Sequence, residues 1–252
     1  DSGDFEIVGK SKKIRDALNQ VKNYAKMKNI KCVLLIGETG TGKELLARYF
    51  AKLAGVGEKF TTLNCAQLIS DDLIASELFG HIKGAFTGAI RDRKGILAEY
   101  DGGVVFLDEI NKTTPRFQSQ LLRFLDSGEI RKVGSNRTEK VNVRLIIALN
   151  EDPEEWLRRG AVLPDFLNRI RRHFVEVPPL RERKEDIPLL VKYFVRKYST
   201  EYGKKIKQIS KKVLEAFKEY DWRSGNVREL ENLIADMIAR ADDDEVILSN
   251  LP

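Results

Sequence analysis

The stretch CVLLIGETGTGKE, residues 32–44, decides the fold of this chain. Five apolar residues, 32–36, predict a strand buried on both faces, and they run directly into a glycine-rich turn. Lys43 follows the turn, and residues 45–53 repeat apolar side chains at helical spacing. Strand, glycine turn, lysine and helix in this order predict a phosphate-binding loop, in which backbone N–H groups and the helix start face a polyphosphate.

We expect this loop to bind a nucleotide, with the Lys43 ammonium neutralising the β- and γ-phosphates. A glycine turn without this role is the alternative, and the flanking strand and helix argue against it. Glu44 stands where such loops usually carry a Ser or Thr whose hydroxyl contacts Mg²⁺. The predicted nucleotide-binding residues of the loop are Gly37, Glu38, Thr39, Gly40, Thr41, Gly42, Lys43 and Glu44.

Length and composition set the class of protein. The 252 residues suffice for one large domain or for a domain with an appendage. No apolar run approaches the ~18 residues of a membrane span, and the first residues lack the apolar core of a secretory signal. We therefore expect a cytoplasmic protein with no membrane partner. The net charge of +6 is spread among many acids and is weak evidence for DNA binding, and Cys32 and Cys65 are predicted to be reduced core residues.

A second buried strand ends in two carboxylates. Residues 104–107 are apolar and are followed by Asp108 and Glu109. Beside a phosphate-binding loop, we expect Asp108 to hold Mg²⁺, directly or through water, and Glu109 to deprotonate the water that attacks the γ-phosphate. Asn64 and Asn150 follow further predicted strands and are expected at the same carboxyl edge of the sheet.

The remaining pattern predicts two domains. Strands are expected at 60–63, 143–149 and 173–177, helices at 14–26 and 114–125, a partial helix over 157–169 and a surface loop over 127–137. Pro178 and Pro179 can continue neither a helix nor a strand ladder, and three helical stripes follow them. We predict an α/β nucleotide-binding domain over residues 1–177 and a small helical domain over 178–252. Arg228 is placed to reach back to a nucleotide between the two.

Residues 84–89, GAFTGA, put one aromatic and one hydroxyl side chain among glycines and alanines. Such a run has little to hold it in a core and would lose much entropy in a helix. We interpret it as a mobile loop tip. An ordinary turn with a buried Phe86 is the alternative that composition alone favours.

Together these motifs resemble the central ATPase domain of the bacterial activators of sigma-54 RNA polymerase, within the AAA+ superfamily. The resemblance covers nearly the whole chain, and GAFTGA is its most specific part. It implies an AAA+ P-loop fold, with a parallel five-stranded sheet flanked by helices and followed by a helical lid. The segments that carry it are GETGTGKE (37–44), LNCAQL (63–68), SELFGH (76–81), GAFTGA (84–89), FLDEI (106–110), VNVRLI (141–146), PPLRER (178–183) and GNVREL (225–230).

The resemblance implies ATP and Mg²⁺ as cofactors and gives roles to single residues. Lys43 would bind phosphate, Asp108 Mg²⁺, and Glu109 the attacking water, while Asn64 would be a polar switch that pairs with Glu109. Asn150 and Arg228 match the first and second sensors of the family, and Val8, in the motif at 7–9, would lie at the nucleotide. Glu44 after Lys43 is normal in this family.

The resemblance also implies partners. The loop formed by Gly84, Ala85, Phe86, Thr87, Gly88 and Ala89 would contact sigma-54 and its RNA polymerase. Arg169 matches the second of two arginines that a neighbouring subunit inserts into the site, which implies a homo-oligomeric ring of six or seven subunits. Leu163 stands where the first of these arginines should be. Contact with promoter DNA is left open, and neither the usual sensory domain nor a DNA-binding domain is evident in this sequence.

Our leading hypothesis is an ATP-hydrolysing ring that remodels the closed promoter complex. The alternative is a scaffold that assembles with ATP and hardly hydrolyses it, which Leu163 favours. Another AAA+ remodelling machine is a third reading, and GAFTGA argues against it.

Overall fold

The computed structural model describes residues 7–68, 70–206, 208–241 and 245–246. Its centre is a five-stranded sheet in which every pairing is parallel. In spatial order the strands are β2 (Phe60–Asn64), β5 (Val104–Asp108), β8 (Arg144–Leu149), β1 (Cys32–Ile36) and β9 (Phe174–Glu176). The predicted fold class is therefore confirmed.

Helices cover both faces of the sheet, which explains why β1 is continuously apolar. Val33 and Leu35 point to one face, where they join the buried side chains of α1 (Lys12–Lys26) and α2 (Lys43–Leu53). Cys32 and Leu34 point to the other face. That face is covered by α3 (Asp71–Phe79), α4 (Ile96–Glu99), α5 (Pro115–Ser127), α6 (Pro153–Arg158) and α7 (Pro164–Ile170).

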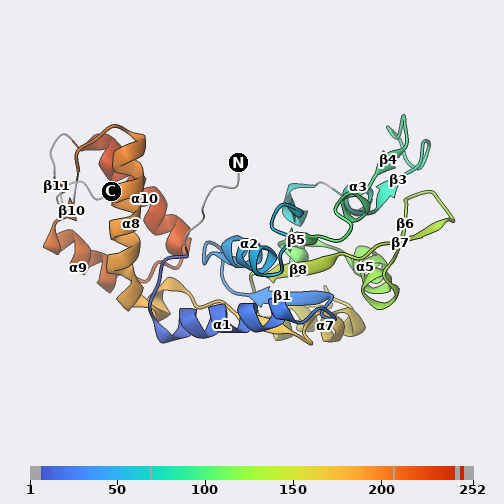
Figure 1. Ribbon diagram of the computed structural model, residues 1–252, viewed down its shortest axis with the longest axis horizontal. Coiled ribbons are helices and arrows are strands. Elements are labelled where there is room, and N and C mark those ends of the chain that lie inside the picture. The colour runs from blue at the N-terminus through green and yellow to red at the C-terminus, as the bar shows by residue number, and fades with distance from the viewer. Residues whose placement is uncertain (1–6, 69, 207, 242–244, 247–252) are drawn as a thin grey trace.

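Two antiparallel hairpins project from the end of the sheet domain that is far from the C-terminal helices (Figure 1). β3 (Gly80–His81) and β4 (Arg93–Lys94) flank residues 84–89. The prediction of a loop over 127–137 was wrong for residues 129–131, which form β6 (Glu129–Arg131) and pair with β7 (Thr138–Lys140), whereas residues 132–137 are the loop between these strands. Only Ile130 of this hairpin's two strands is buried, so the sequence carries almost no alternating pattern.

The C-terminal helices form the lid, which Figure 1 places at the opposite end from the hairpins. The 3₁₀ turns η3 (Leu180–Glu182) and η4 (Lys184–Asp186) lead from β9 to α8 (Ile187–Glu201), α9 (Lys211–Glu219) and α10 (Asn226–Arg240). Phe194, Phe217 and Ile234 are among the buried residues of its own core. A short pair, β10 (Gln208–Ile209) and β11 (Glu245–Val246), completes it, and the boundary between residues 177 and 178 stays a prediction.

Within the described ranges, no helix has the length and apolar character that crossing a membrane requires.

Candidate nucleotide site

A cavity of about 400 Å³ lies between the phosphate-binding loop, the carboxyl edge of the sheet and the lid helices α8 and α10. It brings together residues that are far apart in the sequence. The sequence-predicted residues that line it are Val8, Thr39, Gly40, Thr41, Gly42, Lys43, Glu44, Asn64, Asp108, Glu109, Asn150 and Arg228.

The loop is shaped by its glycines. Gly40 and Gly42 have φ values of 77° and 101°, a region that side-chain-bearing residues rarely adopt. Gly42 directly precedes α2, so the first N–H groups of this helix face the cavity without a side-chain cap. An anion is favoured there because the helix start carries partial positive charge.

Lys43 lies inside the loop and is only 7% exposed. Its Nζ donates to the carbonyl oxygens of Gly37 and Glu38, at 2.5 and 2.9 Å. Burial lowers the pKa of Lys43 to about 8; Asp108 opposes this shift and Arg228 adds to it. The cation is therefore held where a negatively charged ligand would stabilise it.

The two carboxylates stand at the carboxyl end of β5, where Asp108 is the last residue of the strand and Glu109 follows it. Asp108 lies opposite Asn64 in the sheet register, and its Oδ1 accepts a hydrogen bond of 2.9 Å from the backbone N–H of Glu109. Glu109 has a φ of 54°, an unusual value for a non-glycine residue that redirects the chain at the sheet edge.

A magnesium ion fits this donor set. No group of three or more His, Cys, Asp or Glu residues in the described parts of the chain is arranged to hold a metal by itself. Mg²⁺ usually takes one or two carboxylates and completes its shell with water and substrate phosphates, so Asp108 and Glu109 beside a phosphate cradle suit it.

The proposed switch residue is engaged elsewhere. Asn64 Oδ1 accepts a hydrogen bond of 2.8 Å from the N–H of Ala66 and so caps the 3₁₀ turn η1 (Cys65–Gln67). Among the hydrogen bonds of the described residues, none joins the side chains of Asn64 and Glu109. The pairing of these two residues stays a prediction.

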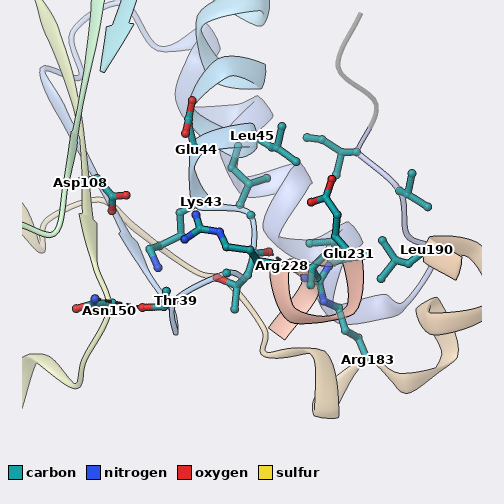
Figure 2. A pocket seen from close by; sticks show the side chains of 18 of the residues that line it. Thr39, Lys43, Glu44, Leu45, Asp108, Asn150, Arg183, Leu190, Arg228 and Glu231 are labelled. Atoms are coloured by element: carbon teal, nitrogen blue, oxygen red, sulfur yellow. Dashed lines mark hydrogen bonds between the residues drawn. The ribbon is translucent and has the colours of Figure 1, made fainter. Parts of the chain in front are cut away.

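The two candidate sensors approach the loop from different elements. Asn150 follows β8, and its Nδ2 donates to Thr39 Oγ1 at 3.3 Å. Arg228 comes from α10 in the lid. Figure 2 shows its side chain reaching toward Lys43, with Asp108 and Asn150 beyond it on the sheet side.

Apolar side chains also line the cavity, and of these the sequence motifs pointed only to Val8. Ile7 and Val8 meet Leu190, Phe194 and Val227 of the lid there. Asp186, fully buried, secures the segment after Val8 by accepting from the N–H groups of Lys10 and Ser11 and from Ser11 Oγ, at 2.6 to 2.8 Å. These apolar side chains suit the flat ring of a nucleotide base.

Three of the residues predicted for the nucleotide site do not line the cavity. Gly37 and Glu38 line a neighbouring cleft, where the Glu38 carboxylate contacts Arg181. Arg169 donates to Asp126 Oδ1 at 2.9 Å and to the carbonyl oxygen of Leu125 at 2.8 Å, both in its own chain. Its action on a neighbouring subunit stays a prediction.

The predicted partner loop, residues 84–89, lies at the surface. Gly84, Thr87 and Gly88 are exposed, whereas Ala89 is buried. Hydrogen bonds from Gly84 N–H to Ala89 O (2.8 Å) and from Ala89 N–H to Phe86 O (3.0 Å) fold the loop into turns. The sequence reading missed the neighbouring Ile90, which is 82% exposed.

Phe86 is only half-buried, so the alternative of a buried Phe86 does not hold. Its ring packs edge-on against His81, with 5.1 Å between centroids, and Ser76 Oγ lies 2.7 Å from His81 Nδ1. The Phe86 ring therefore rests on a side chain that α3 holds in place.

Known proteins resemble this chain over nearly all of its length. XylR of Pseudomonas putida, a transcriptional regulatory protein, is 48% identical over 216 residues, 85% of this chain and 38% of the relative. ZraR of Salmonella typhimurium is 42% identical over 231 residues, 91% and 52% of the two chains. The Nif-specific regulatory protein of Azotobacter vinelandii is 41% identical over 229 residues, 90% and 43%. The chain thus spans about two-fifths to half of the length of these relatives.

Solved structures agree with the sequence relatives. Crystal structures of NtrX from Brucella abortus in complex with ADP and with ATP match at a TM-score of 0.85 and 28% identity, over 98% of this chain and 54% of NtrX. Residues 7–176 match the family described as the sigma-54 interaction domain, and residues 181–252 match the AAA+ ATPase lid domain. The resemblance inferred from the motifs is confirmed, and the chain belongs to the sigma-54 interaction domain family.

Proposed function

We propose that this chain is the ATPase unit of a sigma-54-dependent transcription activator. The observation that carries the proposal is the single cavity in which the phosphate-binding loop, two carboxylates and two candidate sensors converge beneath a lid. Family membership and the nucleotide complexes of NtrX support ATP as the ligand.

The residues of the cavity have different roles in ATP hydrolysis. Lys43 and the start of α2 bind and neutralise the phosphates, and Arg228 adds a second cation from the lid. Asp108 would hold Mg²⁺, directly or through water, and the bound ion would screen the phosphate charge and polarise the phosphoryl oxygens. Glu109 accepts the proton of the attacking water.

We infer that the nucleotide state of the cavity reaches the partner loop through α3. Asn64 and Glu109 lie at the sheet edge, and α3 connects the strand that ends at Asn64 with β3 and residues 84–89. Asp71 at the start of α3 contacts Thr114, which precedes α5, so the helix is also tied to the segment after Glu109. A change at Glu109 is therefore transmitted to Phe86 and Thr87, which engage sigma-54.

Assembly completes the site. Arg169 does not line the cavity of its own chain, and by the family resemblance it acts on the ATP of an adjoining copy in a homo-oligomeric ring of six or seven subunits. The ring works on the sigma-54 RNA polymerase at the promoter, close to its DNA.

Thr87→Ala tests the coupling of hydrolysis to its target. The variant should hydrolyse ATP at the rate of the unmodified chain and fail to open promoter DNA with sigma-54 RNA polymerase. Arg91→Ala, which removes another exposed side chain from the same hairpin, serves as a matched control. Normal promoter opening by Thr87→Ala would show that residues 84–89 are not the working contact.

The second candidate, an ATP-dependent scaffold with little hydrolysis, rests on Leu163. This residue precedes α7 and packs against the core, so it supplies no cation. Steady-state hydrolysis measured against protein concentration separates the two functions. An active ring predicts a specific activity that rises steeply with assembly, whereas the scaffold predicts a low activity at every concentration.

A further inference from the structure

The phosphate-binding loop is tied to the lid on its outer side, away from the nucleotide cavity. The Glu38 carboxylate accepts two hydrogen bonds from the Arg181 guanidinium, at 2.6 and 2.8 Å. It accepts a third from Asn226 Nδ2 at 3.1 Å. Glu38 belongs to the loop by sequence, but its side chain does not line the cavity. It contacts Asn226 at the start of α10 and Arg181 in η3, the turn that leads to the lid.

Asn226 is the centre of this connection. It is fully buried, and its amide bridges three segments of the chain. Nδ2 also donates to the carbonyl oxygen of Thr39 at 3.0 Å, and Oδ1 accepts from the N–H of Leu180 at 2.8 Å. Its φ of 53° is left-handed, a conformation that Asn adopts more readily than most residues.

These contacts fix the start of α10 against the loop, two residues before Arg228. The N–H groups of Val227 and Arg228 point at the carbonyl oxygen of Gly40, at 3.0 and 3.3 Å. A Cβ at Gly40 would lie 1.9 Å from Gly225 O, so no space separates the two segments. Displacing the helix start must therefore displace Arg228.

The charges suit a permanent connection. The hydrogen bonds from Arg181 lower the pKa of Glu38, so its carboxylate is ionised throughout the neutral range. The ion pair alone would contribute little, because both side chains are partly exposed. The buried amide of Asn226 contributes more, because loss of its partners would leave its hydrogen-bonding groups unpaired away from water.

We propose that Glu38 and Asn226 are positioning residues: together with Arg181 they hold the start of α10 on the outer side of the phosphate-binding loop and thereby set Arg228 against the phosphates of ATP. The inference rests on the proposed function in taking ATP as the ligand. It assigns Glu38 to the lid connection and not to the nucleotide.

A double-mutant cycle tests the role. ATP affinity and steady-state KM and kcat would be measured for the unmodified chain, Glu38→Ala, Arg228→Ala and the double variant. Glu38→Ala should weaken ATP binding about tenfold, the effect of losing a charge-assisted hydrogen bond. In the Arg228→Ala background, Glu38→Ala should lower ATP affinity less than about twofold, because the side chain that Glu38 positions is absent.

Two further variants separate positioning from folding. Glu38→Gln keeps the shape and an acceptor for Asn226, so its ATP affinity should lie between those of the unmodified chain and Glu38→Ala. Glu182→Ala removes an exposed carboxylate that neighbours Arg181 in the sequence and pairs with Lys13 at 2.7 Å, and it should leave ATP affinity unchanged. Thermal denaturation of each variant without nucleotide confirms that it is folded.

The outcomes separate this inference from the proposed function. The positioning role would be overturned if Glu38→Ala lowered ATP affinity equally in the presence and absence of the Arg228 side chain, or did not lower it at all. In either case the unmodified chain would still bind ATP. Failure of the unmodified chain to bind ATP would overturn the proposed function itself.

Discussion

Lys43 should take up a proton when ATP binds in mildly alkaline solution. In the free protein burial lowers its pKa to about 8, so about half of the molecules carry a neutral amine at pH 8 and about nine-tenths do at pH 9. Triphosphate beside Nζ favours the ammonium and restores the proton. Binding at pH 8.5 should therefore take up about 0.75 proton per ATP, against about 0.1 at pH 7.

The same linkage sets the affinity. Because the neutral amine must be protonated before it pairs with phosphate, ATP binding should be about tenfold weaker at pH 9 than at pH 7. The stability of the free protein has the opposite dependence. The unfolded chain binds more protons than the folded one between about pH 8 and Lys43's ordinary pKa of 10.5, so Lys43 makes the free energy of unfolding rise with pH in that window.

Calorimetric titration with ATP in two buffers of different ionisation enthalpy measures the proton uptake. Lys43→Arg is the matched control, since a guanidinium stays charged across this range and should abolish the uptake. The two thiols do not interfere, because burial raises the pKa of both Cys32 and Cys65 to about 12. Uptake near zero at pH 8.5, or equal uptake by Lys43→Arg, would refute the assignment of Lys43 as the buried phosphate-binding cation.

Three further variants probe the remaining parts of the site. Glu109→Gln should bind ATP normally in an equilibrium assay and hydrolyse it at least ~100-fold more slowly, as expected for loss of a general base; an unchanged rate would mean that another group activates water. Asp186→Ala leaves the hydrogen-bond donors of Lys10 and Ser11 unpaired, so denaturant titration should show a free energy of unfolding lower by about 1 to 3 kcal/mol, and the KM for ATP should rise. Asp221→Ala removes an exposed carboxylate and should change neither quantity. Equal changes in the two variants would contradict the role of the buried contact. Arg169→Ala should abolish the rise of specific ATPase activity with protein concentration, whereas Arg172→Ala should retain it; a normal rise in Arg169→Ala would rule out Arg169 as the residue inserted by the neighbour.

The sequence predicted the parts of the fold that strong local patterns specify. Residues 32–36 are β1 as expected, because a strand covered on both faces must be continuously apolar. Asn64 and Asp108 end their strands and Asn150 follows β8, so the parallel sheet brings these residues to one edge, as the sequence predicted. The hairpin β6–β7 escaped prediction, since its strands present one buried side chain to the core and its pairing is set by neighbouring elements.

The direction in which a side chain points could not be predicted from the sequence. Membership of the glycine-rich loop placed Glu38 in the right segment, but only packing against the lid decides that its carboxylate faces Arg181 and Asn226. The ion pair of Arg169 with Asp126 could not be predicted either, because Asp126 comes from α5 and no local motif indicates the pairing. The apolar part of the cavity lining depends on Ile7, Leu190 and Val227, which meet only after the lid has folded onto the sheet domain.

Capture of sigma-54 with and without a metal-fluoride analogue of the ATP transition state is the most direct test of whether the nucleotide cavity controls the surface loop. We expect the unmodified chain to retain sigma-54 only when the analogue fills the cavity, and Thr87→Ala to retain none in either condition. Equal retention of sigma-54 with the analogue and without any nucleotide would contradict the claim that the cavity at Lys43 controls the surface loop at residues 84–89.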